Sequence, residues 1–262
     1  MATVDTLVGK IGFTEKRLHD ETPIIFLHGV GSDKSVWRPQ IEHFGQESWG
    51  RAIALDYPGY GESELRAAKT RDDFAVAILS AMDSLAIERA HICGLSLGGV
   101  IAIAMHAIAP GRCASLIVAD SFAVHPDGRA IYDRSITASQ GGMRALAEAR
   151  VGALLASDDA DLKNDVIDTM SRIEPASYRI GAEAVWLADQ VGRAASIGVP
   201  TLMICGELDP ITPPSLSKEL VQIIPDSRLE VIPGASHLAN LDRPAEFNRA
   251  IDDFLSGIDH YA

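Results

Sequence analysis

Ser96 stands in the segment 94–98, whose sequence G-L-S-L-G has the G-x-S-x-G pattern of a nucleophilic serine. The short apolar run 89–94 predicts a strand, and the apolar, alanine-rich run 97–109 predicts a helix. A serine on so tight a turn takes a strained backbone conformation, and the glycines beside it let strand and helix approach while the hydroxyl points outward. The three fixed positions recur by chance in roughly one chain of this length in ten. The strand before the turn and the helix after it therefore make Ser96 the candidate nucleophile.

Two later residues could activate Ser96, because a serine hydroxyl is a weak nucleophile at neutral pH and needs a base that an acid holds in place. His237 is the predicted base, since it alone of the eight histidines follows the last predicted strand at a loop. Asp209, which also follows an apolar run, is the predicted acid that orients it. Asp120 stays open as an alternative acid because it ends a neighbouring strand. We favour Asp209 because three prolines stiffen its loop.

A serine that attacks a carbonyl group creates a negative oxygen, which N–H donors must stabilise. Leu97, the residue after the nucleophile, supplies one predicted donor of this oxyanion hole. The turn 28–30, which follows the apolar run 24–27, supplies the second donor, and we assign it to Val30. His28 in the same turn is expected to brace the loop rather than to take part in catalysis.

Composition and charge narrow the class of protein. The chain has 262 residues, is 47% hydrophobic and carries a formal net charge of −13. Its length and apolar content suit one large α/β core with a small insertion. The acidic balance argues against nucleic acid or an anionic membrane as a partner, because both bind basic surfaces. A small-molecule substrate is therefore the expected partner, and the sequence leaves a homodimer open.

The N-terminal residues and the cysteines indicate the compartment. Acidic Asp5 and Glu15, without a long apolar run near the start, argue against a signal peptide, so we expect a cytoplasmic protein. Cys93, Cys113 and Cys205 lie in apolar runs, which predicts buried free thiols. Their spacing matches no metal motif such as C-x-x-C, and we expect catalysis without a metal or cofactor.

Strands and helices alternate along most of the chain, which predicts a mostly parallel sheet with right-handed crossovers. An antiparallel hairpin at the sheet edge is predicted over 3–18. From 122 to 195 the strand-like runs stop, so we predict a core of residues 1–121 and 196–262 with an inserted helical cap over 122–195. Ligands of such sheets bind beyond the carboxyl ends of the strands, where the candidate residues fall. The predicted core strands are 24–27, 52–55, 89–94, 115–119, 200–205 and 229–232, the predicted core helices are 36–44, 74–86, 97–109, 213–224 and 244–255, and the predicted cap helices are 142–156, 161–173 and 175–190.

Six motifs along the chain are similar to those of one known superfamily. They are His28-Gly29-x-Gly31-Ser32-Asp33 with Trp37-x-Pro39-Gln40, Asp56-x-x-Gly59-x-Gly61-x-Ser63, Cys93-Gly94-Leu95-Ser96-Leu97-Gly98-Gly99, Gly141-Gly142-Met143, Gly206-x-x-Asp209-Pro210-x-Thr212-Pro213-Pro214 and Ala235-x-His237-Leu238-x-Asn240-Leu241-x-x-Pro244. On these motifs the chain resembles the α/β-hydrolase superfamily, and within it the 3-oxoadipate enol-lactonase-like branch of carboxylic-ester hydrolases. The resemblance covers nearly the whole chain. It implies the α/β-hydrolase fold, in which a mostly parallel eight-stranded sheet has helices on both faces and an inserted helical cap.

The resemblance and the predicted triad imply a serine hydrolase that cleaves a carboxylic ester or lactone through an acyl-enzyme, such as a 3-oxoadipate enol-lactonase-like carboxylesterase. A carbon–carbon bond hydrolase of ring-cleavage products is one alternative, although those relatives usually carry Asn where this chain has Leu95. A non-catalytic α/β-hydrolase that binds a small ligand is the other alternative.

Three residues are expected to contact the substrate, namely Trp37, Trp186 and Leu238. Trp37 and Leu238 stand in the shared motifs, and Trp186 lies in a predicted cap helix, where a large aromatic side chain can form the wall of an acyl site. The sequence is equally compatible with Trp186 packing between cap helices. For an enol-lactonase the resemblance also implies a basic group in the cap that binds the substrate carboxylate. The candidates for this group are Arg129, Arg134, Arg144 and Arg150.

Overall fold

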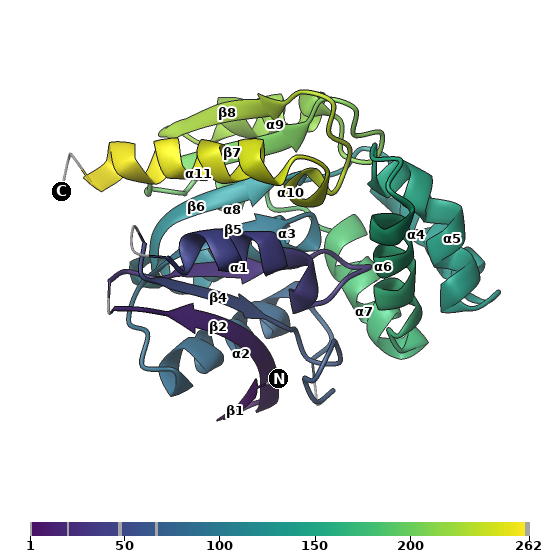
Figure 1. Cartoon of the computed structure of the whole chain (residues 1–262), viewed down its shortest axis with the longest axis horizontal. Helices are drawn as coiled ribbons and strands as arrows, with labels where there is room; N and C mark the ends of the chain where they lie inside the picture. The colour runs from purple at the N-terminus through teal and green to yellow at the C-terminus, as the bar shows by residue number, and fades with distance from the viewer. Residues whose placement is uncertain (1, 20, 47–48, 66–67, 260–262) are drawn as a thin grey trace.

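The computed structural model describes residues 2–19, 21–46, 49–65 and 68–259, and eight strands of this described chain form one sheet (Figure 1). The strands are β1 (Ala2–Thr6), β2 (Gly9–Arg17), β3 (Ile24–Leu27), β4 (Arg51–Leu55), β5 (Ala90–Leu95), β6 (Cys113–Ala119), β7 (Thr201–Gly206) and β8 (Ser227–Ile232). Their order across the sheet is β1-β2-β4-β3-β5-β6-β7-β8. The first two strands form the predicted hairpin, β2 pairs antiparallel with β4, and the other neighbours are parallel. The predicted mostly parallel, eight-stranded sheet is therefore confirmed.

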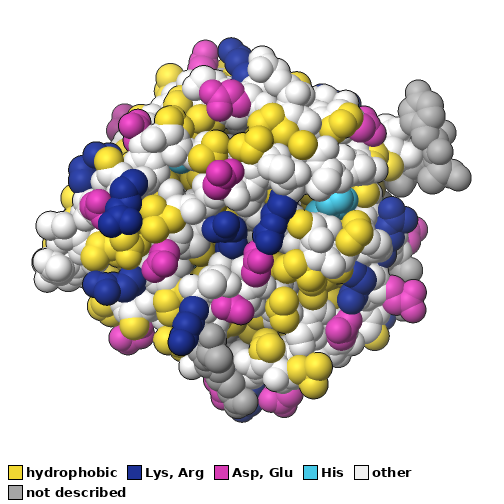
Figure 2. Space-filling view, turned by 180° about the vertical axis from the view of Figure 1, so that it is seen from behind, with side chains coloured by type: hydrophobic (Ala, Val, Ile, Leu, Met, Phe, Trp, Pro, Cys, Tyr) yellow, Lys and Arg dark blue, Asp and Glu magenta, His cyan; other side chains and the backbone are white. Residues whose placement is uncertain are grey.

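Helices cover both faces of the sheet. On one face lie α1 (Arg38–Phe44) and α11 (Pro244–Asp259), and on the other lie α2 (Arg71–Ser84), α3 (Leu97–Ile108), α8 (Val191–Ala194) and α9 (Pro214–Ile223). Figure 1 shows α1 and α11 in front of the strands and α2 and α3 behind them. Figure 2 shows the molecule from behind, where basic, acidic and apolar side chains are interspersed. None of the described helices has the length and apolar content needed to cross a membrane.

The two faces bury separate apolar layers, because successive side chains of a strand point to opposite sides. In β3, Ile25 and Leu27 belong to the layer beneath α2 and α3, whereas Ile24 and Phe26 belong to the layer beneath α1 and α11. All four side chains are fully buried. A strand covered on both faces reads as a continuous apolar run, which explains why the sequence predicts the core strands to within two residues of their observed ends.

Four further helices follow β6 and gather at one end of the sheet (Figure 1). They are α4 (Gly128–Ser139), α5 (Met143–Leu154), α6 (Ala160–Ser171) and α7 (Pro175–Trp186). The sequence pattern predicts α5, α6 and α7 but misses α4. In α4 the buried positions are Gly128 and Ser135, and its apolar side chains Ile131, Tyr132 and Ile136 are only partly buried, so its apolar stripe is short. Three short helical segments also lie between the main elements, namely the 3-10 helices η1 (Lys34–Trp37) and η2 (Pro110–Arg112) and the one-turn helix α10 (Ala239–Asp242).

The turn at Ser96 brings three chain segments into backbone contact. Ser96 has φ 55° and ψ −111°, a left-handed conformation that costs free energy for a residue other than glycine. A Cβ atom on Gly94 would lie 2.1 Å from the carbonyl oxygen of Gly98, and a Cβ atom on Gly98 would lie 2.1 Å from the carbonyl oxygen of Leu27. Backbone atoms cannot rotate away from such a clash. Glycine at both positions is therefore a condition for the turn that holds Ser96 at the end of β5.

Gly94→Ala is expected to lower the free energy of unfolding by about 3 kcal/mol or more, because the added methyl group overlaps backbone atoms. Urea denaturation measures the change. The matched control is Gly152→Ala in α5, where no atom lies within 4 Å of the added Cβ. Alanine at such an exposed helical position should stabilise the protein by about 0.5–1 kcal/mol. Equal stabilities for the two variants would show that the turn tolerates a side chain at Gly94.

Candidate active site

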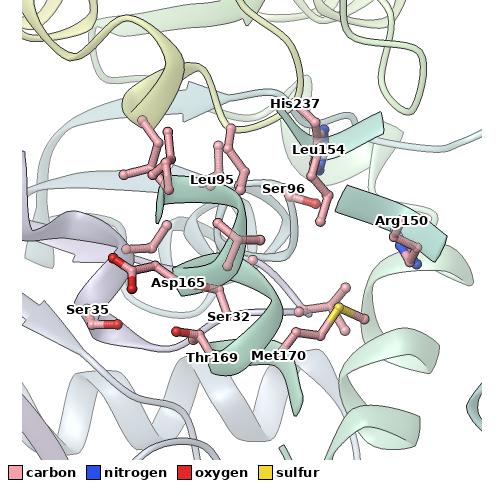
Figure 3. A pocket seen from close by; sticks show the side chains of 18 of the residues that line it. Ser32, Ser35, Leu95, Ser96, Arg150, Leu154, Asp165, Thr169, Met170 and His237 are labelled. Carbon is pink, nitrogen blue, oxygen red and sulfur yellow. The ribbon is translucent and has the colours of Figure 1, made fainter. Parts of the chain in front are cut away.

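Ser96 lies at the wall of a cavity, with its backbone fixed on both sides. Its N–H donates to the carbonyl oxygen of Ala119 at the end of β6 (2.8 Å), and Ser121 Oγ donates to the Ser96 carbonyl oxygen (2.7 Å). The cavity has a volume of about 390 Å³, within the range of small-molecule sites (Figure 3). The turn geometry and these two bonds together determine where the Ser96 hydroxyl points.

His237 and Asp209 form a hydrogen-bonded pair next to this cavity. His237 Nδ1 donates to Asp209 Oδ2 at 2.8 Å, and both side chains are buried. The Asp209 carboxylate also accepts bonds from Thr212 Oγ1 (2.5 Å), from the Thr212 N–H (3.1 Å) and from the Ile211 N–H (2.7 Å). Burial by itself would raise the pKa of Asp209, but the charge of His237 and the bonds from His237 and Thr212 lower this pKa to about 2. Asp209 is therefore ionised at neutral pH and holds Nδ1 of the ring in its protonated form.

Thr212 is a site residue to which the sequence reading assigned no role. Besides its bonds to Asp209, its hydroxyl lies 3.2 Å from His237 Nδ1. The sequence did contain a signal for Thr212, because this residue stands in the motif that also contains Asp209. A threonine three residues after an aspartate can bond back to it only when the loop folds as a turn, and the sequence does not specify that turn.

Ser96 and His237 line the same cavity, and Figure 3 shows the two side chains close to one another on its wall. Within the described residues, no hydrogen bond joins Ser96 Oγ to His237 Nε2. Bonds between a catalytic nucleophile and its base are often long before substrate binds and shorten in the reactive complex. The structure thus brings the three predicted residues to one site, with the bond between acid and base already formed.

Asp120, the alternative acid, has a different environment. It lies just after β6 and is fully buried, and its Oδ1 accepts the Gly206 N–H at 2.8 Å. Burial first, and the charge of Asp209 second, raise the pKa of Asp120 well above its ordinary value. A raised pKa favours the neutral form of Asp120, whereas the lowered pKa of Asp209 favours its charged form. The geometry therefore favours Asp209 over Asp120 as the group that orients His237.

The two predicted oxyanion donors flank Ser96. Leu97 begins α3 directly after it, and the loop of Val30 packs against it, since a Cβ atom on Gly29 would lie 3.5 Å from Ser96 Cβ. Val30 also lines the cavity. Among the described residues, neither the Val30 N–H nor the Leu97 N–H donates a hydrogen bond to another protein group. Both donors are therefore free to bind a negative oxygen.

A buried network braces the loop that carries Val30. Burial is the largest influence on His28 and lowers its pKa, so the neutral ring donates Nδ1–H to the Gly29 carbonyl oxygen (2.8 Å). Tyr57 Oη donates to the His28 carbonyl oxygen (3.1 Å). Asp56 accepts both the backbone N–H (2.7 Å) and the Nζ (2.6 Å) of Lys34, four residues after Val30. These contacts agree with the expectation that His28 braces its loop.

Of the three residues expected to contact substrate, the structure brings one to the cavity. Leu238 lines it, next to His237. Trp37 does not, because its fully buried ring packs in the core against Phe26, with ring centroids 5.0 Å apart. Trp186 is likewise absent from the cavity lining and stacks on Phe122 at 5.8 Å, with 2% of its surface exposed. Neither Trp37 nor Trp186 lines this cavity, since both rings fill the protein interior.

Of the four candidate arginines, Arg150 is the one that lines the cavity. It is half-buried in α5, and its guanidinium donates to Tyr178 Oη at 3.2 Å. Arg129 and Arg144 are exposed and pair along their own helices with acidic residues four positions later. Arg134 is exposed on α4. The cavity geometry thus separates candidates that the sequence could not rank.

The remaining cavity wall has both apolar and polar side chains and comes from several elements. Leu154 of α5 and six residues of α6 contribute to it, so the helices after β6 form part of the cavity. Within the described chain, no three His, Cys, Asp or Glu side chains gather in a way that could hold a metal ion. The three cysteines are free and buried, as their apolar surroundings predict. The α6 residues are Leu162, Asp165, Val166, Asp168, Thr169 and Met170.

Asp120→Asn is expected to stabilise the protein at pH 7 but not near pH 4. In the unfolded chain Asp120 ionises above about pH 4, whereas the raised pKa in the folded chain favours the protonated form, so folding takes up protons above this pH. The free energy of unfolding of the wild type should therefore fall by about 1.4 kcal/mol per pH unit above pH 4, up to the raised pKa. Asparagine needs no proton and avoids this loss. Urea denaturation at pH 4, 5.5 and 7 measures the difference.

The control for this prediction is Asp226→Asn, which changes an exposed aspartate. This variant should stay within about 0.5 kcal/mol of the wild type at each pH. If Asp120→Asn were less stable than the wild type at pH 7, with the deficit growing from pH 4 upward, Asp120 would be ionised in the folded protein.

Comparisons with known proteins agree with this architecture. The model of the alpha/beta hydrolase family matches residues 24–250. The 3-oxoadipate enol-lactonase 1 of Acinetobacter baylyi is 30% identical over 240 residues, which cover 90% of this chain and 89% of that protein. The carboxylesterase YbfK of Bacillus subtilis is 27% identical over 271 residues, which cover 97% of this chain and 87% of that protein. The crystal structure of the enol-lactonase from Burkholderia xenovorans LB400 superposes with a TM-score of 0.90 at 26% identity, covering 97% of this chain and 100% of that chain. These similarities confirm the resemblance found in the sequence motifs, and the chain belongs to the alpha/beta hydrolase family.

Proposed function

We propose that the protein is a serine hydrolase that cleaves a carboxylic ester or a lactone through a covalent acyl-enzyme. The observation that carries this proposal is the arrangement at the cavity: Ser96 stands on a strained turn, and His237 is bonded to Asp209 at 2.8 Å beside it. The names of two relatives support the substrate class, since one is a 3-oxoadipate enol-lactonase and the other a carboxylesterase.

In the first half of the reaction, Ser96 Oγ attacks the carbonyl carbon and His237 Nε2 takes the hydroxyl proton. Asp209 stabilises the positive charge that the imidazole then carries. The carbonyl oxygen becomes negative and binds the N–H groups of Val30 and Leu97. When the tetrahedral intermediate collapses, the bond to the alcohol oxygen breaks and His237 returns its proton to that oxygen. In a lactone the same step opens the ring, so the alcohol remains attached to the acyl group.

In the second half, water attacks the acyl group on Ser96 while His237 takes a proton from it. The second tetrahedral intermediate breaks the ester bond to Ser96, and His237 returns the proton to Ser96 Oγ. The product is a carboxylic acid. Each step uses protein side chains, backbone N–H groups and water, so the proposed reaction needs no metal or cofactor.

We assign the helical segment 122–195 the role of a cap that selects the substrate. Its α5 and α6 supply Leu154, Leu162 and Val166 to the cavity wall. The core supplies the reacting groups, and the cap supplies most of the apolar surface opposite them. Differences in these cap side chains should therefore change which acyl or alcohol groups fit, with about 1–3 kcal/mol for each methylene-sized contact.

Arg150 gives this cavity a binding site for a negative group. Within the described residues no carboxylate pairs with it, whereas Arg144 on the same helix pairs with Asp168 at 2.9 Å. Tyr178 Oη, its hydrogen-bond partner, is a neutral group. Figure 3 shows Arg150 and Asp165 on opposite sides of the cavity, so the acidic side chain does not neutralise the basic one. The proposed substrates therefore carry a carboxylate that binds Arg150 while the reacting carbonyl lies at Ser96.

Ser96→Ala should abolish the turnover of every ester or lactone that the wild type hydrolyses, because loss of the nucleophile costs on the order of 10⁶ in kcat. A panel of p-nitrophenyl esters, simple lactones and an enol-lactone provides the substrates. Ser196→Ala, at an exposed serine after α8, is the control and should match the wild type. Turnover that survives in Ser96→Ala would contradict the proposal. A wild type that binds panel members without hydrolysing any would favour the ligand-binding alternative.

Arg150→Met should remove the preference for acyl groups that end in a carboxylate. The measurement compares kcat/KM for p-nitrophenyl butyrate with kcat/KM for the mono-p-nitrophenyl ester of glutaric acid. Bonds to a charged group contribute about 1.5–3 kcal/mol, so the ratio of the two values should fall by roughly 10- to 100-fold. Arg134→Met, at an exposed position of α4 outside the cavity lining, should leave the ratio unchanged. An equal loss on both substrates in Arg150→Met would mark Arg150 as a structural residue.

A further inference from the structure

The carboxylate of Asp242 joins the end of α5 to the loop that carries His237. Asp242 is the last residue of α10, and 6% of its surface is exposed. Its Oδ2 accepts the N–H groups of Ser236 (2.8 Å) and Ala156 (2.9 Å), and its Oδ1 accepts the N–H of Ser157 (2.9 Å). Two of these donors follow α5 in the cap, and the third directly precedes His237. One buried side chain therefore holds a cap segment and the loop of the base together.

Two further hydrogen bonds connect the same segments. Ser236 Oγ donates to the Ala153 carbonyl oxygen (2.9 Å), and the Leu238 N–H donates to the Leu154 carbonyl oxygen (2.8 Å). The residues on both sides of His237 are thus bonded to the last turn of α5. Leu154 and Leu238 also line the cavity. The end of α5 therefore supports the imidazole and forms part of the substrate wall at the same time.

The bond to Asp209 fixes the Nδ1 end of the His237 ring, but it does not fix the backbone from which the ring extends. Proton transfer requires Nε2 within about 2.6–3.2 Å of the serine oxygen, and a misplacement of about 1 Å can cost 10²-fold in rate. The contacts that hold the backbone at Ser236 and Leu238 set this distance. Asp242 accepts one of these contacts directly and holds the end of α5 for the other two.

We propose that Asp242 is a positioning residue, which couples the placement of the cap helix α5 to the position of the His237 imidazole. The role of His237 in this statement rests on the proposed function. The coupling means that the α5 end of the cap moves together with the base, so a substrate that displaces Leu154 also displaces the His237 loop. Correct seating of the acyl group is thereby linked to correct placement of the base.

Asp242→Asn is the informative variant, because asparagine keeps the shape but offers one acceptor oxygen where the carboxylate offers two. Its NH₂ group would face a backbone N–H, so at least one of the three donors loses its partner. For a p-nitrophenyl ester that the wild type hydrolyses, kcat should fall roughly 10- to 100-fold while KM stays within about threefold. The pH profile of kcat/KM should also shift, because the imidazole no longer sits in its original contacts. Asp242→Glu, which keeps both oxygens, should recover part of kcat.

Asp252→Asn is the control, since both oxygens of Asp252 likewise accept hydrogen bonds, here from the side chains of His43 and Trp49, but Asp252 lies away from the cavity lining. Thermal unfolding of both variants shows how much stability each loses. An unchanged kcat in Asp242→Asn, or a fall in kcat that both variants share in proportion to lost stability, would overturn the proposal. If Asp242→Asn does not fold, Ser236→Ala replaces it as the test variant, because it removes the bond to the Ala153 carbonyl oxygen. The same outcomes support or overturn the proposal, and the expected fall in kcat is smaller.

A measurement without turnover separates this proposal from the proposed function. The Nδ1–H proton of His237, bonded to the Asp209 carboxylate, should give a low-field signal in the proton NMR spectrum. In Asp242→Asn this signal should shift or broaden, whereas in Asp252→Asn it should stay as in the wild type. An unchanged signal in Asp242→Asn would overturn the coupling, even if the protein hydrolyses esters. Absence of Ser96-dependent hydrolysis with a changed signal would overturn the proposed function and leave the coupling standing.

Discussion

The close backbone approach at the Ser96 turn is the constraint on which the rest of the site depends. Gly94 and Gly98 allow β5, α3 and β3 to pack at distances that no side chain would permit. The apolar layers on both faces of the sheet hold these segments together and so sustain the unfavourable φ of Ser96. Because β6, β7 and β8 follow β5 in order across the sheet and run parallel to it, residues that follow those strands reach the same edge as Ser96. The sheet thereby collects groups that are far apart in the sequence.

Two buried carboxyl groups near that edge illustrate how environment decides protonation. Asp209 receives hydrogen bonds from Thr212 and from His237, and its pKa is lowered to about 2. Asp120 is fully buried and lies near the negative charge of Asp209, and burial first and this charge second raise its pKa. The same residue type therefore has a lowered pKa in one position and a raised pKa a short distance away. An ionised Asp209 suits the role of orienting an imidazole, whereas Asp120 accepts a structural hydrogen bond from the Gly206 N–H at the end of β7.

The sequence predicts the fold and the candidate reacting groups because their signals are local. The central strands are mostly apolar runs, and the candidates Ser96, Asp209 and His237 each follow a predicted strand at a turn. Asp120 follows one as well, so local pattern could not decide between the two acids. Their hydrogen-bond partners and burial distinguish them, and these depend on residues distant in the sequence.

The substrate side of the cavity could not be predicted in the same way. Trp37 and Trp186 were expected at the substrate, yet both fill the core, because a large aromatic residue in a motif can serve packing as well as binding. The sequence could not select Arg150 from four arginines, since its selection depends on how α5 lies over the cavity. No sequence motif assigned a role to Asp242. Its three N–H partners can be identified only from the tertiary structure, which brings the end of α5 and the His237 loop together.

Covalent trapping of the nucleophile tests the central claim most directly. The protein is incubated with an alkyl p-nitrophenyl phosphonate, digested, and its peptides are mapped by mass spectrometry. The account predicts one phosphonate group per chain, attached to Ser96. Attachment of the phosphonate to a different residue would contradict the account. So would a treated protein that still hydrolyses esters and whose Ser96 is unmodified.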